Sequence, residues 1–217
     1  MRVVVPFAVE QPKTRLTDVF APAERRELAR VMLADVLRSL RDAGHAPEVL
    51  ATAEIDVDAP LTVDERPLNA AVDTVLEGAE LPVAVVMADL PLATPDALAR
   101  LFVPEDDVVL APGRGGGTNA LLTRHPAFRV DYHGASYRDH RERAHDHGAS
   151  VATVDSHRLA TDVDECTDLA EVLLHGTGAT RRWLEAQGVR LDASGDGRVT
   201  VCRDHPAVRQ GDRPKSG

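Results

Sequence analysis

The sequence contains few aromatic residues and only two cysteines. Aromatic side chains make up 3% of the 217 residues, whereas 43% are hydrophobic, so valine, leucine and alanine must supply most of the core. Such a core is typical of buried parallel strands and of the helices that cover them. Cys166 and Cys202 lie far apart and show no metal-ligand spacing, so neither a disulfide framework nor a cysteine-based zinc site is indicated.

The chain also lacks long apolar runs and an excess of positive charge. No stretch of about 18 apolar residues occurs, and the N-terminus enters a strand-like run, Met1 to Phe7, without a signal-peptide pattern. The formal net charge of -10 is spread along the chain, which disfavours binding to nucleic acid or to an anionic membrane. We therefore expect a globular, cytoplasmic enzyme whose partners include neither nucleic acid nor membrane.

Lysine is nearly absent. Of the 25 basic residues only Lys13 and Lys215 are lysines. A chain that combines arginine with many acidic residues is typical of proteins adapted to high salt. Lys13 is an exception to this bias, and we expect a specific reason for it.

Strand-like and helix-like segments alternate along the chain. The expected strands are 1–7, 48–52, 83–87, 108–111, 151–154 and 159–164, and the expected helices are 22–43, 68–76, 95–101, 136–147, 167–174 and 179–187. Thr94 and Ser136 are expected to cap the helices at which they stand. The alternation predicts an α/β fold with a mostly parallel, doubly wound sheet, whose ligands bind beyond the carboxyl ends of the strands. We assign residues 1–188 to one domain and 189–217 to a polar, mobile C-terminal appendage in which only Val199–Cys202 is strand-like.

Two acidic groups follow predicted strands. Asp89 comes directly after the most apolar strand, and Asp162 and Asp164 would share one face if their segment is extended. Each group could also be an ordinary polar turn in so acidic a chain. If the fold brings the groups together, they form the kind of carboxylate site that binds magnesium in phosphoryl and nucleotidyl transfer.

Lys13 and Arg15 stand on the loop after the first strand, where a triphosphate would run along the sheet edge. Lysine supplies a compact charge and arginine a two-pronged donor for phosphate oxygens. A solvated surface pair is the alternative, and the scarcity of lysine elsewhere counts against it.

A glycine-rich loop and a histidine-containing segment carry weaker signals. Gly113–Gly117 lacks the spacing of a phosphate-binding P-loop. Its glycines would allow a ligand to approach closely, but a plain hairpin turn fits the pattern equally well. His140, His145 and His147 lie in a charged segment, where a solvated helix is expected rather than a metal site.

Five short motifs occur in an order that resembles a known family. They are Pro12-Lys13-Thr14-Arg15-Leu16, Leu68-Asn69, Asp89-Leu90-Pro91-Leu92, Gly117-Thr118-Asn119-Ala120-Leu121 and Asp162-Val163-Asp164. Together, over roughly residues 1–175, they resemble the 2-phospho-L-lactate guanylyltransferases of coenzyme F-420 biosynthesis, and the composition points to a halophilic archaeon. The resemblance implies a nucleotidyltransferase fold of the glycosyltransferase-A type, GTP as donor, and 2-phospho-L-lactate or phosphoenolpyruvate as acceptor.

The same resemblance implies roles for individual residues. The magnesium ligands would be Asp89, Asp162 and Asp164. The nucleotide would be contacted by Pro6, Lys13, Arg15, Asn69 and Asp89, with Lys13 and Arg15 steadying the triphosphate and Asn69 contacting the base. Catalysis would then rest on Lys13, Arg15 and Asp89. Members of this family also suggest a homodimer.

The acceptor contacts would come from Thr118, Gly134 and Ser136. Here the sequence departs from the family, because His133 stands where a glycine is expected after the aromatic residue Tyr132. The acceptor phosphate is already anionic and can attack the α-phosphorus of GTP in line with departing pyrophosphate, so no strong general base is needed.

Two other functions remain compatible with the sequence. One is a nucleotidyltransferase of the same fold with another phosphorylated acceptor, such as a molybdenum-cofactor guanylyltransferase or a sugar-phosphate enzyme. The glycine-rich first loop of the former is not matched by Pro12-Lys13-Thr14-Arg15. The other is a nucleotide-sensing module without turnover, which could dispense with one of the three carboxylates.

Overall fold

The core of the molecule is a seven-stranded, mostly parallel sheet. The computed structural model describes residues 1–10, 12–194 and 197–203. In chain order the strands of this sheet are β1 (Arg2–Phe7), β2 (Pro47–Ala51), β3 (Leu61–Val63), β4 (Val83–Val86), β5 (Val108–Pro112), β6 (Thr118–Thr123) and β7 (Val151–Thr153). Their spatial order is β3-β2-β1-β4-β6-β5-β7, and β6 alone runs antiparallel to its neighbours.

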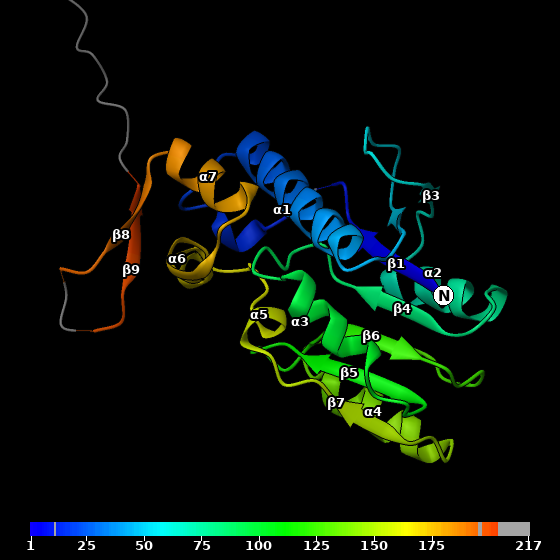
Figure 1. The fold of residues 1–217 in the computed structure, drawn as a ribbon. Helices are drawn as coiled ribbons and strands as arrows, with labels where there is room; N and C mark the ends of the chain where they lie inside the picture. Colours follow the sequence, from blue (N-terminus) through cyan, green and yellow to red (C-terminus); the bar gives the residue numbers. More distant parts are fainter. Residues whose placement is uncertain (11, 195–196, 204–217) are drawn as a thin grey trace, which may run out of the picture.

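Helices cover both faces of this sheet, which confirms the doubly wound prediction (Figure 1). The helices are α1 (Pro22–Asp42), α2 (Leu68–Gly78), α3 (Pro95–Ala99), α4 (Ser136–Asp146), α5 (His157–Ala160), α6 (Cys166–His175) and α7 (Ala179–Ala186). Side chains alternate across a strand, so Val3 and Val5 of β1 pack with α1 and α3 while Val4 packs with α2. No helix in the described ranges is both long enough and apolar enough to cross a membrane.

The outer side of α1 forms a third layer with α6 and α7. Leu28 and Met32 of α1 are buried with Leu169 of α6 and Trp183 of α7. Next to this layer, β8 (Val189–Asp192) and β9 (Thr200–Arg203) form a separate antiparallel hairpin. These strands belong to the segment predicted as an appendage, and β9 contacts α6; residues 204–217 of that segment lie outside the described residues.

Capping residues mark the ends of several helices. Pro22 stands at the start of α1, where the Glu24 carboxylate accepts the Ala21 N–H (2.8 Å), and Gly44 ends the segment with a φ of 86°. The Thr94 hydroxyl accepts the Ala97 N–H as predicted. The predicted Ser136 cap is wrong, because Ala135 is the residue before α4 and the Ser136 hydroxyl instead accepts the Thr118 N–H.

One other expectation is wrong, one alternative is decided and one strand was missed. The predicted strand 159–164 is the end of the short helix α5 followed by an irregular segment. Ser156 starts that helix by accepting the Leu159 N–H, a cap that competes with extended structure. The glycine-rich loop is a hairpin turn, because β5 and β6 pair antiparallel on either side of it. The short edge strand β3 was not predicted.

Candidate active site

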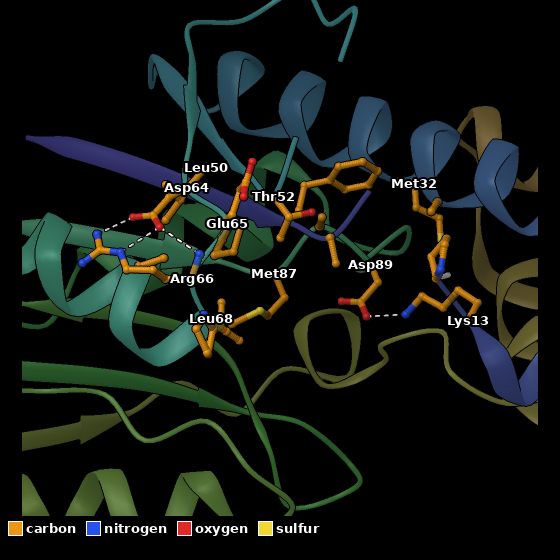
Figure 2. A pocket seen from close by; sticks show the side chains of 18 residues that line it. Lys13, Met32, Leu50, Thr52, Asp64, Glu65, Arg66, Leu68, Met87 and Asp89 are labelled. Atoms are coloured by element: carbon orange, nitrogen blue, oxygen red, sulfur yellow. Dashed lines mark hydrogen bonds and ion pairs between the residues drawn. The ribbon is translucent and has the colours of Figure 1, made fainter. Parts of the chain in front are cut away.

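A pocket opens at the carboxyl ends of β1, β2 and β4. Its volume is about 540 Å³. The walls come from the ends of β1 and β2, from α1 and α2, and from segments 64–68 and 87–89. Figure 2 shows Lys13 and Asp89 at one end of this pocket, with Asp64 and Arg66 at the other. The pocket therefore lies where a doubly wound sheet is expected to bind its ligand.

Lys13 joins two acidic groups that are far apart in sequence. Its Nζ donates to Asp89 Oδ2 (2.5 Å) and to Asp164 Oδ1 (2.8 Å). Burial by itself lowers the pKa of Lys13, but the two carboxylates outweigh it and hold that pKa above its ordinary value. Asp89 and the segment that carries Asp164, far apart in sequence, are thus brought together around Lys13.

The backbone of Lys13 is also unusual. It has φ 56° and ψ 46°, in the left-handed region, and is the single described residue other than glycine with positive φ. That conformation costs a side-chain-bearing residue on the order of 1–2 kcal/mol. A lysine in such a conformation indicates that its side chain has a functional role.

Asp162 and Asp164 lie on the segment between α5 and α6, which docks on Asp89. The N–H of Val163 donates to the carbonyl of Asp89 (3.1 Å). Asn119 of β6 donates through Nδ2 to Asp162 Oδ1 (3.1 Å) and to the carbonyl of Leu159 (2.9 Å). Burial raises the pKa of Asp162, and the neighbouring carboxylates of Asp89 and Asp164 raise it further.

Asp168 fixes the end of this acidic segment, a role that the sequence did not reveal. Its carboxylate accepts the N–H groups of Asp164 (3.0 Å) and Glu165 (2.7 Å) at the start of α6. Arg114, in the glycine-rich turn, donates to the other oxygen of Asp168 (2.7 Å). The spacing of three residues between Glu165 and Asp168 is that of a helix-capping pair and could have identified it.

Arg15 does not accompany Lys13 into the pocket. Its side chain is 68% exposed and lies 3.4 Å from Glu165. It lines a different hollow, together with Asp162 and Asp164. The 3-10 turn Thr14–Leu16 separates the directions of the two basic side chains.

Pro6 lines the pocket, whereas the Asn69 amide is bonded outside it. Asn69 Oδ1 accepts the Tyr132 N–H (2.7 Å), and its Nδ2 donates to Asp131 Oδ1 (3.3 Å). Both ends of the amide thus hold the 131–132 segment against α2. Each end of the amide uses one of its two hydrogen-bonding positions here, so contact with a base would have to use the remaining N–H or oxygen lone pair.

Thr118, Gly134 and Ser136 come together in the structure, but on the other side of β6 from Lys13. Thr118 donates its N–H to Ser136 Oγ (2.9 Å), and both residues are buried. Gly116 packs against Gly134, because a Cβ on Gly116 would lie 3.1 Å from the Gly134 carbonyl oxygen. The three residues therefore join the glycine-rich turn to the start of α4.

His140 is fully buried, so its predicted place on a solvated face is wrong; His145 and His147 are exposed as expected. The Nε2 of His140 accepts the Asp131 N–H (2.7 Å), and the Nδ1 of His140 lies 2.9 Å from the Thr118 hydroxyl. An accepting Nε2 requires a neutral ring. Burial, reinforced by the charge of Arg143, lowers the pKa of His140 to about 4.

The far end of the pocket carries a charged triplet that the sequence analysis did not select. Asp64, Glu65 and Arg66 follow β3 and line the pocket. Asp64 accepts from the backbone and side chain of Arg66, and these bonds lower its pKa to about 2. Three consecutive charged residues directly before Pro67 were the signal available in the sequence.

The carboxylates around Lys13 offer oxygen donors to a hard divalent cation. Asp89 and Asp164 both accept from Lys13, and Asp162 lies near enough to both for their charges to raise its pKa, although the three do not bring one oxygen each within 4.8 Å of the others in the described structure. Oxygen donors of this kind are preferred by magnesium over softer metals. A bound cation would offset the surplus negative charge of these carboxylates and so allow a polyanion to approach.

Comparison with known proteins decides the family. The family model described as "Guanylyl transferase CofC like" matches residues 1–204. The chain belongs to this guanylyltransferase family. A 2-phospho-L-lactate guanylyltransferase from Halomicrobium mukohataei is 63% identical over 203 residues, covering 94% of this chain and 100% of that one. Another from Haloarcula marismortui is 57% identical over 210 residues, covering 94% and 99%; both relatives come from halophilic archaea.

Solved structures of more distant proteins share the fold of this chain. A protein from Desulfovibrio desulfuricans G20, assigned as a nucleotide-diphospho-sugar transferase, superposes with a TM-score of 0.66 at 16% identity, covering 86% of this chain and 96% of that one. The inositol-1-phosphate CTP transferase from T. maritima gives 0.51 at 12% identity, covering 85% and 97%. The CofC-like guanylyltransferase therefore has the α/β nucleotidyltransferase fold predicted from its sequence.

Proposed function

We propose that the chain transfers GMP from GTP to 2-phospho-L-lactate, or to phosphoenolpyruvate, and releases pyrophosphate. The observation that carries this proposal is the meeting of Lys13, Asp89 and Asp164 at the mouth of the pocket. The names of the relatives support the donor and the acceptor. The product would be lactyl-2-diphospho-5'-guanosine or its enolpyruvyl counterpart.

The side chains at the pocket mouth would orient two polyanions for in-line attack. An oxygen of the acceptor phosphate forms the new bond to the α-phosphorus, and the bond from that phosphorus to the β-phosphate oxygen breaks. Magnesium, held by Asp89, Asp162 and Asp164, would supply charge neutralisation between the reactants. The Lys13 ammonium gives two of its three N–H donors to Asp89 and Asp164, which leaves the third for a phosphate oxygen.

The end of the pocket lined by Glu65 and Arg66 suits a guanine base. Guanine presents N1–H and N2–H₂ donors beside the O6 acceptor on one edge, a pattern that a carboxylate and a cation can bind together. Glu65 offers such a carboxylate and Arg66 such a cation. Leu50, Leu68 and Met87 line the apolar stretch between this end and Asp89 (Figure 2).

Pyrophosphate release tests the proposal directly. We expect release when the protein is mixed with GTP, magnesium and either 2-phospho-L-lactate or phosphoenolpyruvate, with lower kcat/KM for ATP and CTP. The Asp89→Asn protein should remain folded and lose most magnesium-dependent turnover, because the substitution removes charge from the carboxylate site. Release with 3-phosphoglycerate or a sugar phosphate instead would show another acceptor, and GTP binding without release would show a sensing module.

A further inference from the structure

Two histidines and a glutamate meet between α5 and α6, and none of the three lines the pocket. His157 is the first residue of α5, and Glu171 and His175 lie one turn apart on α6. Residues four apart on a helix share a face. The two helices flank the segment 161–165 that carries Asp162 and Asp164 (Figure 1).

The distances in this cluster match those between the ligands of one metal ion. Glu171 Oε2 lies 3.5 Å from His157 Nε2 and 3.6 Å from His175 Nε2. One ligand atom from each of the three residues lies within 4.8 Å of the others. Around a tetrahedral zinc ion, with bonds near 2.0–2.1 Å, ligand atoms are separated by roughly 3.4 Å. A small inward movement of the two rings would therefore place the three ligand atoms at three corners of a tetrahedron around one ion.

Neighbouring groups hold these three side chains in a suitable arrangement. Arg114 Nη1 lies 3.4 Å from Glu171 Oε1, which leaves Oε2 directed at the histidines. An outer partner of this kind orients a metal-binding carboxylate. The side chains of His157 and His175 are 51% and 50% exposed, and both line a hollow with Asp155, so an ion can enter and keep a water molecule as a further ligand.

We propose that His157, Glu171 and His175 form a second metal site, selective for zinc or a similar transition-metal ion. Two imidazole nitrogens and one carboxylate oxygen are a ligand set that suits zinc, nickel and copper, whereas magnesium requires oxygen donors. The site is therefore chemically distinct from the three aspartates near Lys13. A bound ion would tie α5 to α6 and so close a ring around the segment that carries Asp162 and Asp164.

Titration with zinc chloride tests this site. We expect the full-length protein, in buffer saturated with magnesium, to bind one zinc ion per chain by calorimetry and to unfold at a higher temperature in its presence. His157→Gln and His175→Gln should each weaken zinc binding by at least about 100-fold, because loss of a direct ligand should exceed the 10- to 100-fold cost of losing an outer partner. Both variants should keep the melting temperature of the parent when zinc is absent.

Two controls separate this site from other places that bind zinc. His145→Gln removes an exposed histidine on α4, outside the cluster, and should leave zinc binding unchanged. Asp89→Asn should also retain it, since that residue belongs to the other carboxylate group. The proposal is overturned if the parent binds no zinc, or if His157→Gln and His175→Gln bind it as tightly as His145→Gln.

Discussion

The identity of Lys13 is explained by the space and the charges around its side chain. The side chain is 10% exposed and lies between Asp89 and Asp164. A slender ammonium fits between the two carboxylates, which we propose as ligands of magnesium, whereas a planar guanidinium needs more width and favours two oxygens on one partner. The scarcity of lysine in the composition led to the same residue that the structure places at the centre of the site.

Lys13→Arg is therefore expected to impair the reaction although it keeps the charge. We predict a loss of about tenfold or more in kcat/KM, roughly 1.4 kcal/mol of transition-state stabilisation, with little change in melting temperature. Steady-state kinetics and thermal unfolding would measure the two effects. The matched control is Lys215→Arg, the other lysine, which lies outside the described residues. Parent-like kinetics in both variants would remove Lys13 from the catalytic group.

His140 shows what sequence reasoning could not supply at the scale of one residue. Its segment is rich in charge, so a solvated helix was the natural prediction. Its partners are the Asp131 N–H and the Thr118 hydroxyl, which no helical pattern specifies. A usable signal did exist, since Ser136, His140 and Ala144 recur every four residues and form the buried stripe of α4.

At the scale of elements, the β5–β6 hairpin links the glycine-rich turn to the carboxylate site. A Cβ on Gly113 would lie 2.5 Å from Asn119 Oδ1, closer than any side chain can tolerate. Asn119 in turn holds Asp162 and the carbonyl of Leu159. Gly113 is therefore required because the amide that positions a carboxylate occupies the space where a side chain would be.

Gly113→Ala should reduce activity through this contact. We predict a loss of roughly 1–3 kcal/mol in unfolding free energy from overpacking and at least about a tenfold fall in kcat/KM, because Asp162 is displaced. Gly115→Ala in the same turn is the matched control, since a Cβ there meets nothing within 4 Å. Asn119→Ala, which removes the amide without adding bulk, should share the loss of activity. Equal activity in the Gly113→Ala and Gly115→Ala proteins would show that the contact is unimportant.

Across the whole molecule, the sequence predicted layers and strand ends better than side-chain partners. Alternating strands and helices implied a doubly wound sheet with Asp89 at the end of a central strand, whereas Asp162 was predicted in a strand that the structure does not contain. The direction of Arg15 and the bonds of Asn69 depend on the 3-10 turn at 14–16 and on the 131–132 segment, which have no periodic signal. The antiparallel direction of β6 was missed for a similar reason, because a hairpin and an open loop share the same glycine-rich pattern.

The C-terminal hairpin contacts the segment that leads into α1. Arg203 of β9 donates to the Val19 carbonyl (2.7 Å) and to both oxygens of Glu24 (3.0 and 2.5 Å), and its guanidinium lies 5.1 Å from the centre of the Phe20 ring. The same Glu24 carboxylate accepts the Ala21 N–H at the start of α1. One arginine from the hairpin thus holds the start of α1, a helix that packs on one face of the sheet.

Arg203→Ala should consequently destabilise the whole domain. We predict a loss of roughly 2 kcal/mol in unfolding free energy, from charge-assisted hydrogen bonds and the contact with Phe20, or roughly 4–8 °C in melting temperature. Arg198 is an exposed arginine of the same hairpin segment, and Arg198→Ala should change the melting temperature by less than about 1 °C.

The contact between Arg203 and Glu24 should also depend on pH. The hydrogen bond from Arg203 lowers the pKa of Glu24 below its usual value of 4.5, so this stabilisation is complete above that pH and is lost as acid protonates the carboxylate. The difference between parent and Arg203→Ala should therefore shrink on acidification below about pH 4.5, and a difference that stays constant down to pH 3 would show that the Glu24 ion pair contributes nothing.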